Sequence, residues 1–226
     1  MRDPYIDENG VLKNKLNITD YDQLRRAEAD IGFLKLISVD KVIGNFDEML
    51  FRDIHKHIFE DIFEWAGEYR TVPLVKEEVV LPGYSIPYTD SKSIKKELSS
   101  RISRMNSINW RNMEIEDLSR TFARELALLW KVHPFRDGNT RTTLSFAFLF
   151  AKEHGFPFDI ETFTQELNRE YDGVTGRITK YNVRDKFVLA CLDDKDYPEV
   201  DPLAAVFYKA IINYKNKHKQ NNKSVL

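Results

Sequence analysis

The decisive stretch of this sequence is Val132-His133-Pro134-Phe135-Arg136-Asp137-Gly138-Asn139-Thr140-Arg141, a polar turn between two apolar helical patterns. It places a titratable base, a carboxylate, a glycine, an amide and guanidinium groups within a few residues. If this cluster were only buried core, every polar group would need a partner, and each missing partner would cost about 1 to 3 kcal/mol. A functional role explains this concentration of polar chemistry more simply than a structural one.

The turn has the chemistry of a phosphate site. Apolar residues recur at helical spacing on both sides of it, so Asp137 to Thr140 are expected at a helix N-terminus. Unpaired N–H groups and the helix dipole attract anions there, and Gly138 lets a phosphate approach the backbone closely. Arg141 adds a planar set of donors, and Asp137 is an oxygen ligand suited to Mg²⁺. His133 is the expected general base.

The composition favours one soluble cytoplasmic domain. The chain has 226 residues without a Gly/Pro/Ser-rich linker, so we expect a single domain over residues 1–226. A formal charge of −2 argues against nucleic acid as the main partner. The single cysteine, Cys191, lies in an apolar run and favours a reducing compartment. No apolar run reaches transmembrane length, and the N-terminus lacks a signal-peptide pattern.

Most of the chain shows helical periodicity, which predicts an all-α bundle. An aspartate or threonine, Asp20 or Thr19, is expected to cap the first helix. His55 and His57 are two residues apart on a helix and cannot converge on one metal, so we expect surface or packing roles for them. The expected helices cover residues 21–37, 46–65, 91–105, 115–131, 139–154, 160–171, 179–192 and 202–214. The Lys- and Asn-rich tail from about 215 to 226 is expected to be disordered.

One segment, at about residues 71–88, departs from the helical pattern. Two β-favouring runs flank the charged tip Lys76-Glu77-Glu78, and prolines at 73, 82 and 87 keep the segment out of a central sheet. We expect a two-stranded hairpin whose open edge can pair with an extended peptide. A loop without a binding role is an equally good alternative from these residues alone.

The stretch from His133 to Arg141 resembles the H-x-F-x-[D/E]-G-N-x-R signature of Fic (filamentation induced by cAMP) domain proteins. Trp65-Ala66-Gly67-Glu68-Tyr69-Arg70-Thr71-Val72 is also similar to the segment that enters the family's target-docking flap. The resemblance implies a helical bundle with a small β-hairpin flap beside the active site. It also implies transfer of AMP from ATP to a Tyr, Thr or Ser hydroxyl of a target protein.

The resemblance also implies roles for individual residues. His133 would be the base, Asp137 the Mg²⁺ ligand, and Phe135 the anchor of the loop in the core. The nucleotide would contact Arg136, Gly138, Asn139, Thr140 and Arg141. The flap would dock the target by β-strand addition along Thr71, Val72, Lys76, Val79 and Val80.

The sequence departs from the fullest family pattern, G-N-G-R-x-x-R, at two positions. Thr140 replaces the second glycine, and Leu144 stands where a second arginine would help to hold the terminal phosphate. The family's inhibitory [S/T]-x-x-x-E-[G/N] motif has no full match, so regulation by that motif is not expected, and a separate antitoxin protein could still block the site. Leucine at position 144 therefore allows either slower turnover or a preference for a nucleotide other than ATP.

Other functions stay open at this point. A Doc-like kinase or another phosphoryl transferase would use the same turn with a different nucleotide orientation. A non-catalytic interaction module would retain the fold and use the flap edge to hold partners. A helical metal-dependent phosphohydrolase fits less well, because such sites need several His or Asp ligands and only His133 and Asp137 are close in sequence.

Overall fold

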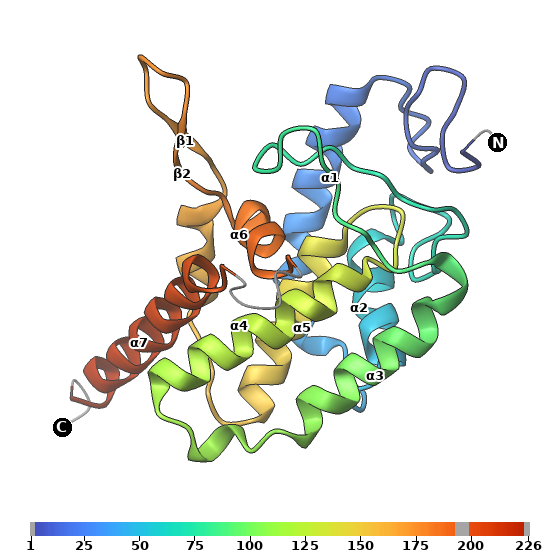
Figure 1. Cartoon of the computed structure of the whole chain (residues 1–226). Helices are drawn as coiled ribbons and strands as arrows, with labels where there is room; N and C mark the ends of the chain where they lie inside the picture. The colour runs from blue at the N-terminus through green and yellow to red at the C-terminus, as the bar shows by residue number, and fades with distance from the viewer. Residues whose placement is uncertain (1–2, 193–198, 224–226) are drawn as a thin grey trace. The chain divides into compact units, whose positions relative to one another are not determined.

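The computed structural model describes residues 3–192 and 199–223 and confirms the helical fold class (Figure 1). The α-helices are α1 (Tyr21–Leu36), α2 (Glu48–Phe59), α3 (Ile94–Ser107), α4 (Ile115–Val132), α5 (Asn139–Glu153), α6 (Val183–Ala190) and α7 (Asp201–Lys223). Short 3-10 helices lie at η1 (Val39–Lys41), η2 (Ser91–Ser93), η3 (Trp110–Asn112) and η4 (Ile160–Glu166). Strands β1 (Glu170–Tyr171) and β2 (Ile178–Lys180) form an antiparallel pair.

Polar side chains define where the helices begin. Asp20 caps α1, as expected, by accepting the N–H of Gln23 at 2.8 Å. Asp47 caps α2 by accepting the N–H groups of Met49 and Leu50. Asn182 and Asp185 form a reciprocal capping box at α6. These short side chains satisfy N–H groups that have no partner inside the helix.

The chain folds into two compact units. The first contains the described residues up to Leu74 together with Tyr88–Asn106 and Val132–Phe146. The second contains Val75–Pro87, Ser107–Lys131 and the described residues from Ala147 onward. The turn from His133 to Arg141 belongs entirely to the first unit. The single-domain organisation expected from the sequence stays a prediction.

The first unit has a core built on α2. Phe51, Ile54, Ile58 and Phe59 are fully buried on one face of this helix. Phe135 of the signature turn joins them, with its ring stacked on Phe51 at a centroid distance of 6.0 Å. Full burial of one such side chain stabilises the fold by about 1.5 to 3 kcal/mol. Phe135 therefore anchors the turn in this core, as the sequence predicted.

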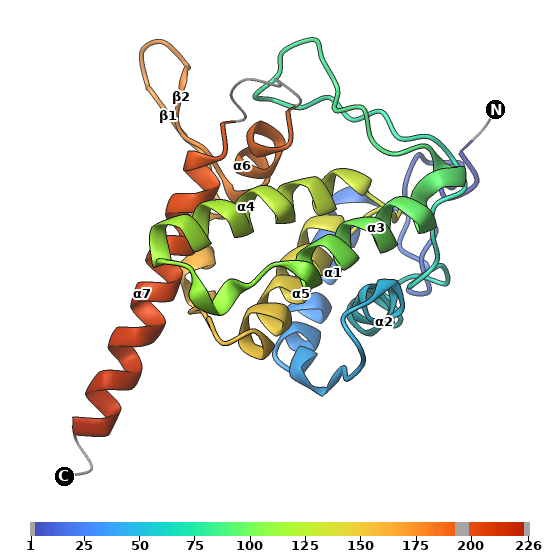
Figure 2. The ribbon, with the colours of Figure 1, turned by 60° about the horizontal axis from the view of Figure 1, so that its bottom comes forward.

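The second unit has an aromatic core of its own. Phe122 of α4 packs against the rings of Trp110, Phe150, Phe156 and Phe207, with centroid distances of 5.0 to 6.1 Å. Phe207 comes from α7, the long C-terminal helix of Figure 2. Cys191 is buried, as expected for a small apolar side chain.

Two expected helices, at 160–171 and 179–192, are interrupted by the hairpin of β1 and β2, which projects from its unit in Figure 1. Its turn is formed by Asp172, whose carboxylate accepts the N–H groups of Val174 and Thr175. Gly176 follows with a φ of 68°. Local side-chain bonds and a left-handed glycine therefore override the helical periodicity here.

The segment at 71–88 contains no strand in the structure, so the hairpin expected there is wrong. Its prolines remove ladder donors. Within the second unit, the side chain of Glu78 is buried and pairs with Arg184 at 2.6 Å. The N–H of Lys76 donates to the hydroxyl of Ser85 at 3.2 Å, where a strand partner was expected. Side-chain contacts thus replace the predicted backbone ladder.

The tail expected to be disordered from about residue 215 is helical as far as Lys223. Lys217 of α7 pairs with Asp159 at 2.9 Å and with Glu161 at 2.6 Å, which fixes this part of the helix to its own unit. Residues 224–226 lie outside the described part of the chain. Within that part, none of the helices has both the length and the apolar character needed to cross a membrane.

Replacing Gly138 by alanine should destabilise the protein by about 3 kcal/mol, measured by urea unfolding. Gly138 has a φ of 76°, and an added Cβ would lie 2.3 Å from the Phe59 ring. Gly10→Ala is the matched control, because Gly10 has a φ of 81° with no atom within 4 Å of an added Cβ. The control should lose only about 1 kcal/mol. Equal losses would contradict the close approach to Phe59.

Candidate active site

The signature loop runs from His133 to Gly138 and leads into α5, which begins at Asn139. His133 is buried with a φ of 49°, which is uncommon for a residue with a side chain. Its imidazole stacks against the ring of Tyr88 at 4.1 Å. The carbonyl of Gly138 accepts the first helical hydrogen bond, from the N–H of Thr142 at 3.0 Å. The N–H groups before Thr142 therefore lie at the helix N-terminus, as the sequence predicted.

Asn139 braces the loop from inside. Its amide oxygen accepts the N–H of Phe135, and its amide nitrogen donates to the carbonyl of Phe135, both at 2.9 Å. The side chain is buried, so these two bonds replace the contacts that it would make with water. The amide of Asn139 thus shapes the loop, and the predicted anion site would use the adjacent backbone N–H groups instead.

Asp137 lies half-buried at the entrance to α5. One of its carboxylate oxygens accepts the N–H of Gly138 at 2.6 Å, which fixes the side chain beside the helix N-terminus. The main-chain carbonyl of Asp137 has a separate partner in the ring of His55, at 3.1 Å. The N–H of Gly138 therefore orients the side chain of Asp137, and His55 of α2 orients its backbone carbonyl.

His55 supports the loop from α2 and is fully buried. The N–H of Gly67 donates to its Nδ1 at 2.8 Å, so a neutral ring carries its hydrogen on Nε2 and donates to Asp137. The ring also stacks on Phe135 at 3.7 Å. Burial lowers the pKa of His55 to about 3, which keeps the ring neutral. The packing role expected for His55 is confirmed, but its contact with the signature loop was missed.

The two arginines of the turn are paired with carboxylates. Arg136 binds Asp3 with Nε and Nη2, at 2.9 and 2.8 Å. Arg141 binds the carboxylate of Glu28 at 2.6 Å and lies over the Phe59 ring at 4.4 Å. Carboxylates from the N-terminal part of the chain therefore hold both guanidinium groups in place.

Glu28, from α1, is the second residue that the sequence did not reveal. Its side chain is buried, and burial raises the pKa of its carboxyl group. The charge of Asp137 raises that pKa further, whereas the guanidinium of Arg141 lowers it. Glu28 and Asp137 thus repel each other across a site in which Arg141 supplies the compensating charge.

The predicted flap residues divide between the two units. Thr71 and Val72 belong to the first unit, where the N–H of Thr71 donates to the hydroxyl of Tyr5 at 3.1 Å. Lys76, Val79 and Val80 belong to the second unit, where Val79 is half-exposed. Target docking by these residues stays a prediction.

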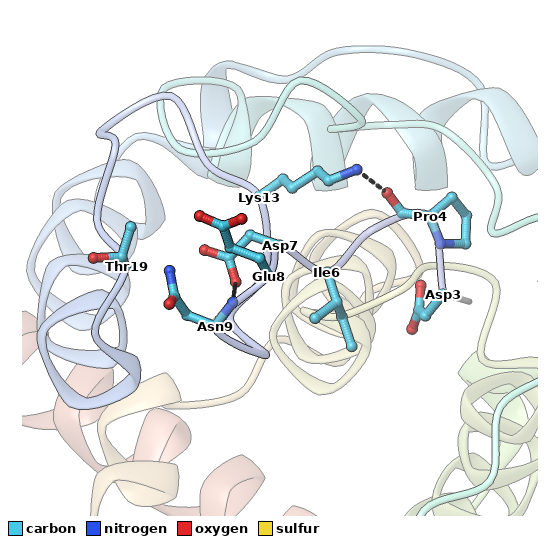
Figure 3. Close-up of a pocket in the computed structure, with 8 residues that line it drawn as sticks. All are labelled: Asp3, Pro4, Ile6, Asp7, Glu8, Asn9, Lys13 and Thr19. Atoms are coloured by element: carbon cyan, nitrogen blue, oxygen red, sulfur yellow. Dashed lines mark hydrogen bonds between the residues drawn. The ribbon is translucent and has the colours of Figure 1, made fainter.

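A cavity of about 590 Å³ lies away from the signature turn, among N-terminal residues between Asp3 and Thr19 (Figure 3). It is an open hollow with several polar side chains, and no residue from 133 to 141 lines it. Asp3, at its edge, is the residue that holds Arg136. The residues of the predicted site therefore lie outside this hollow.

Residues 45–151 match the model of the Fic/DOC family, and this part of the chain is a Fic/DOC domain. The protein adenylyltransferase VbhT of Bartonella schoenbuchensis is 31% identical over 171 residues, which is 74% of this chain and 34% of that protein. The chain thus spans about a third of the length of this relative.

Solved structures share the fold. The N-terminal Fic domain of the Bep8 effector protein from a Bartonella species has a TM-score of 0.71 at 21% identity, covering 91% of this chain and 93% of that one. The N-terminal Fic domain of a VirB-translocated effector from Bartonella quintana, with bound ADP, has a TM-score of 0.66 at 23% identity. That match covers 91% of this chain and 93% of that one.

The stability difference between the wild type and His55→Gln should shrink by about 2 kcal/mol between pH 7 and pH 5. The unfolded wild type binds a proton at His55 below pH 6.5, whereas the folded protein keeps this ring neutral down to about pH 3. The contribution of His55 is therefore complete above pH 6.5 and is lost as the pH falls toward 3.

Urea unfolding of both proteins across this pH range measures the difference, in which contributions from other titrating groups cancel. Phe51→Leu is the control, because it weakens the same core without removing a titratable group. Its difference from the wild type should not change with pH. A His55→Gln difference that is equally constant would refute the buried neutral ring.

Proposed function

We propose that this chain is a protein adenylyltransferase, which transfers AMP from ATP to a hydroxyl group of a target protein. The observation that carries the proposal is the loop from His133 to Gly138, which joins a histidine and a carboxylate to the N-terminus of α5. This loop lies inside the matched family segment. The adenylyltransferase among the relatives and the ADP bound in a structural neighbour support the same reaction.

Mg²⁺ fits the donors that this site offers. Nowhere in residues 3–192 and 199–223 do three His, Cys, Asp or Glu side chains gather around a possible metal position. Mg²⁺ commonly binds through one or two carboxylates together with phosphate oxygens and water. Asp137 would be that carboxylate. When bound, the ion neutralises negative charge on the phosphates.

In the proposed reaction, His133 takes the proton of the target hydroxyl while the hydroxyl oxygen forms a bond to the α-phosphorus. The bond between the α-phosphorus and the bridging oxygen breaks, and pyrophosphate leaves. The N–H groups at the start of α5 hold the phosphates, and Arg141 adds a cation beside them. The target would dock along residues 71–81, with Thr71, Val72, Lys76, Val79 and Val80 in contact with it.

A second candidate is transfer of the γ-phosphoryl group, as in the Doc branch of the family. The observation that favours it is Leu144, which cannot hold a terminal phosphate as an arginine would. A nucleotide held by fewer charged contacts is less constrained in its orientation. The two reactions differ in which phosphorus reaches the target.

Incubation with α-labelled ATP should transfer the label to protein, whereas γ-labelled ATP should not, because AMP retains only the α-phosphorus. Replacing His133 by alanine should lower the labelling by about 100-fold or more, since the base is lost. His57→Ala is the matched control, as a partly buried histidine of α2 outside the signature loop. It should keep near wild-type labelling.

Three results would contradict this assignment in different ways. Label from the γ position alone would indicate phosphoryl transfer. Nucleotide binding by a folded protein without transfer of either label would indicate a non-catalytic module. Full labelling by His133→Ala would refute the role of this residue as the base.

ADP should bind nearly as tightly as ATP, because Leu144 offers the terminal phosphate only packing contacts. Leu144→Arg should strengthen ATP binding by about 10- to 100-fold, since a charge-assisted hydrogen bond contributes about 1.5 to 3 kcal/mol. Calorimetry with both nucleotides measures this, and Leu144→Met is the uncharged control. A strong ATP preference in the wild type, with no gain from the added arginine, would contradict the prediction.

A further inference from the structure

Arg70 is a buried cation whose known partners are backbone carbonyl groups. Its side chain is 2% exposed, yet its described hydrogen bonds do not include a carboxylate. Nε donates to the carbonyl of His133 at 2.8 Å, Nη1 donates to Val72 at 2.8 Å, and Nη2 donates to Thr89. A charged group at this depth is costly unless its partners are well placed, so these three bonds need an explanation.

The hydrogen bond from Nε of Arg70 holds the backbone of His133, the proposed base. The main chain of Arg70 also donates, from its N–H to the carbonyl of Pro134 at 2.8 Å. Two consecutive peptide groups, those after His133 and after Pro134, are thus held by one residue. His133 has a φ of 49°, a conformation that persists only where surrounding contacts impose it. This backbone sets the direction in which the His133 side chain leaves the main chain, and Arg70 holds the backbone in place.

The hydrogen bonds from Nη1 and Nη2 of Arg70 hold the backbone at the two ends of the segment at 71–88. Val72 lies where this segment begins, and Thr89 directly follows its end. Tyr88, the neighbour of Thr89, stacks on the His133 imidazole at 4.1 Å. One guanidinium therefore holds the backbone of His133 and, through Thr89, the position of the ring that packs on the imidazole. All of these residues belong to the first unit.

We propose that Arg70 is a positioning residue for the reaction, which orients the His133 imidazole and joins it to both ends of the predicted docking segment. The proposal rests on the assignment of His133 as the base. A lysine cannot replace Arg70 in this role, because its single ammonium cannot reach three carbonyls that a planar guanidinium spans. Docking of a target and orientation of the base would thus be linked through one side chain.

Arg70→Lys should lower kcat for AMP transfer by about tenfold or more, since small displacements of a catalytic group reduce rates strongly. The dissociation constant for ADP should change by less than about threefold, because Arg70 does not contact the helix N-terminus that holds phosphates. Arg52→Lys is the matched control. Arg52 also donates from Nε to a carbonyl, that of Gly67 at 2.8 Å, but makes no described bond to the signature loop.

A second readout does not depend on activity. The protein has five histidines, and the NMR signal of His133 is identified by its loss in His133→Ala. Arg70→Lys should shift this signal and change its titration curve, whereas Arg52→Lys should not. This result would support the positioning role even if the wild type transfers no AMP. An unchanged His133 signal, or an ADP affinity that falls as much as kcat, would overturn it.

If Arg70→Lys does not fold, Tyr88→Ala tests the same linkage. Removing this ring should change the midpoint of the His133 titration curve and lower kcat while leaving ADP binding unchanged. A wild-type midpoint together with a wild-type kcat in Tyr88→Ala would refute the linkage between the end of this segment and the imidazole.

Discussion

The buried carbonyl groups of the signature loop are the constraint on which the rest of the site depends. Outside a helix or sheet, each buried carbonyl needs a donor from elsewhere, or it costs about 1 to 3 kcal/mol. The carbonyl of His133 has the guanidinium of Arg70, and that of Asp137 has the ring of His55. The carbonyl of Phe135 has the amide of Asn139. The irregular loop can therefore stay buried, because side-chain donors satisfy its backbone carbonyl groups.

The sequence predicted the chemical groups of the signature loop but not the residues that support it. His133, Asp137, Gly138 and the helix after them are contiguous, so spacing alone predicts their arrangement. His55 and Arg70 contact the loop across 82 and 63 positions, and Glu28 reaches Arg141 across 113 positions. A single sequence carries no signal for such long-range pairs. Periodicity predicted that His55 lies on a helix but could not show which loop its ring would meet.

The difference between local sequence patterns and long-range contacts also explains which parts of the fold the sequence predicted. The helices were predicted because apolar residues repeat along them over several turns. The hairpin after η4 was missed because its turn depends on local bonds of Asp172, which periodicity does not show. The strands predicted at 71–88 fail for a different reason. The pairing of Glu78 with Arg184 is a contact across 106 positions, and it competes with the ladder that β propensity favours.

The charges around the signature loop indicate how a nucleotide would enter the proposed site. Asp3, Glu28 and Asp137 carry three negative charges, and Arg70, Arg136 and Arg141 carry three positive ones, so the formal charges balance. A bare triphosphate would meet two guanidinium groups that already have carboxylate partners. Because the charge of Asp137 raises the pKa of Glu28, a divalent cation beside Asp137 would relieve that repulsion while also neutralising the phosphates. The carboxylate partners of both arginines and the repulsion between Glu28 and Asp137 therefore support the proposal that a nucleotide would bind as its Mg²⁺ complex.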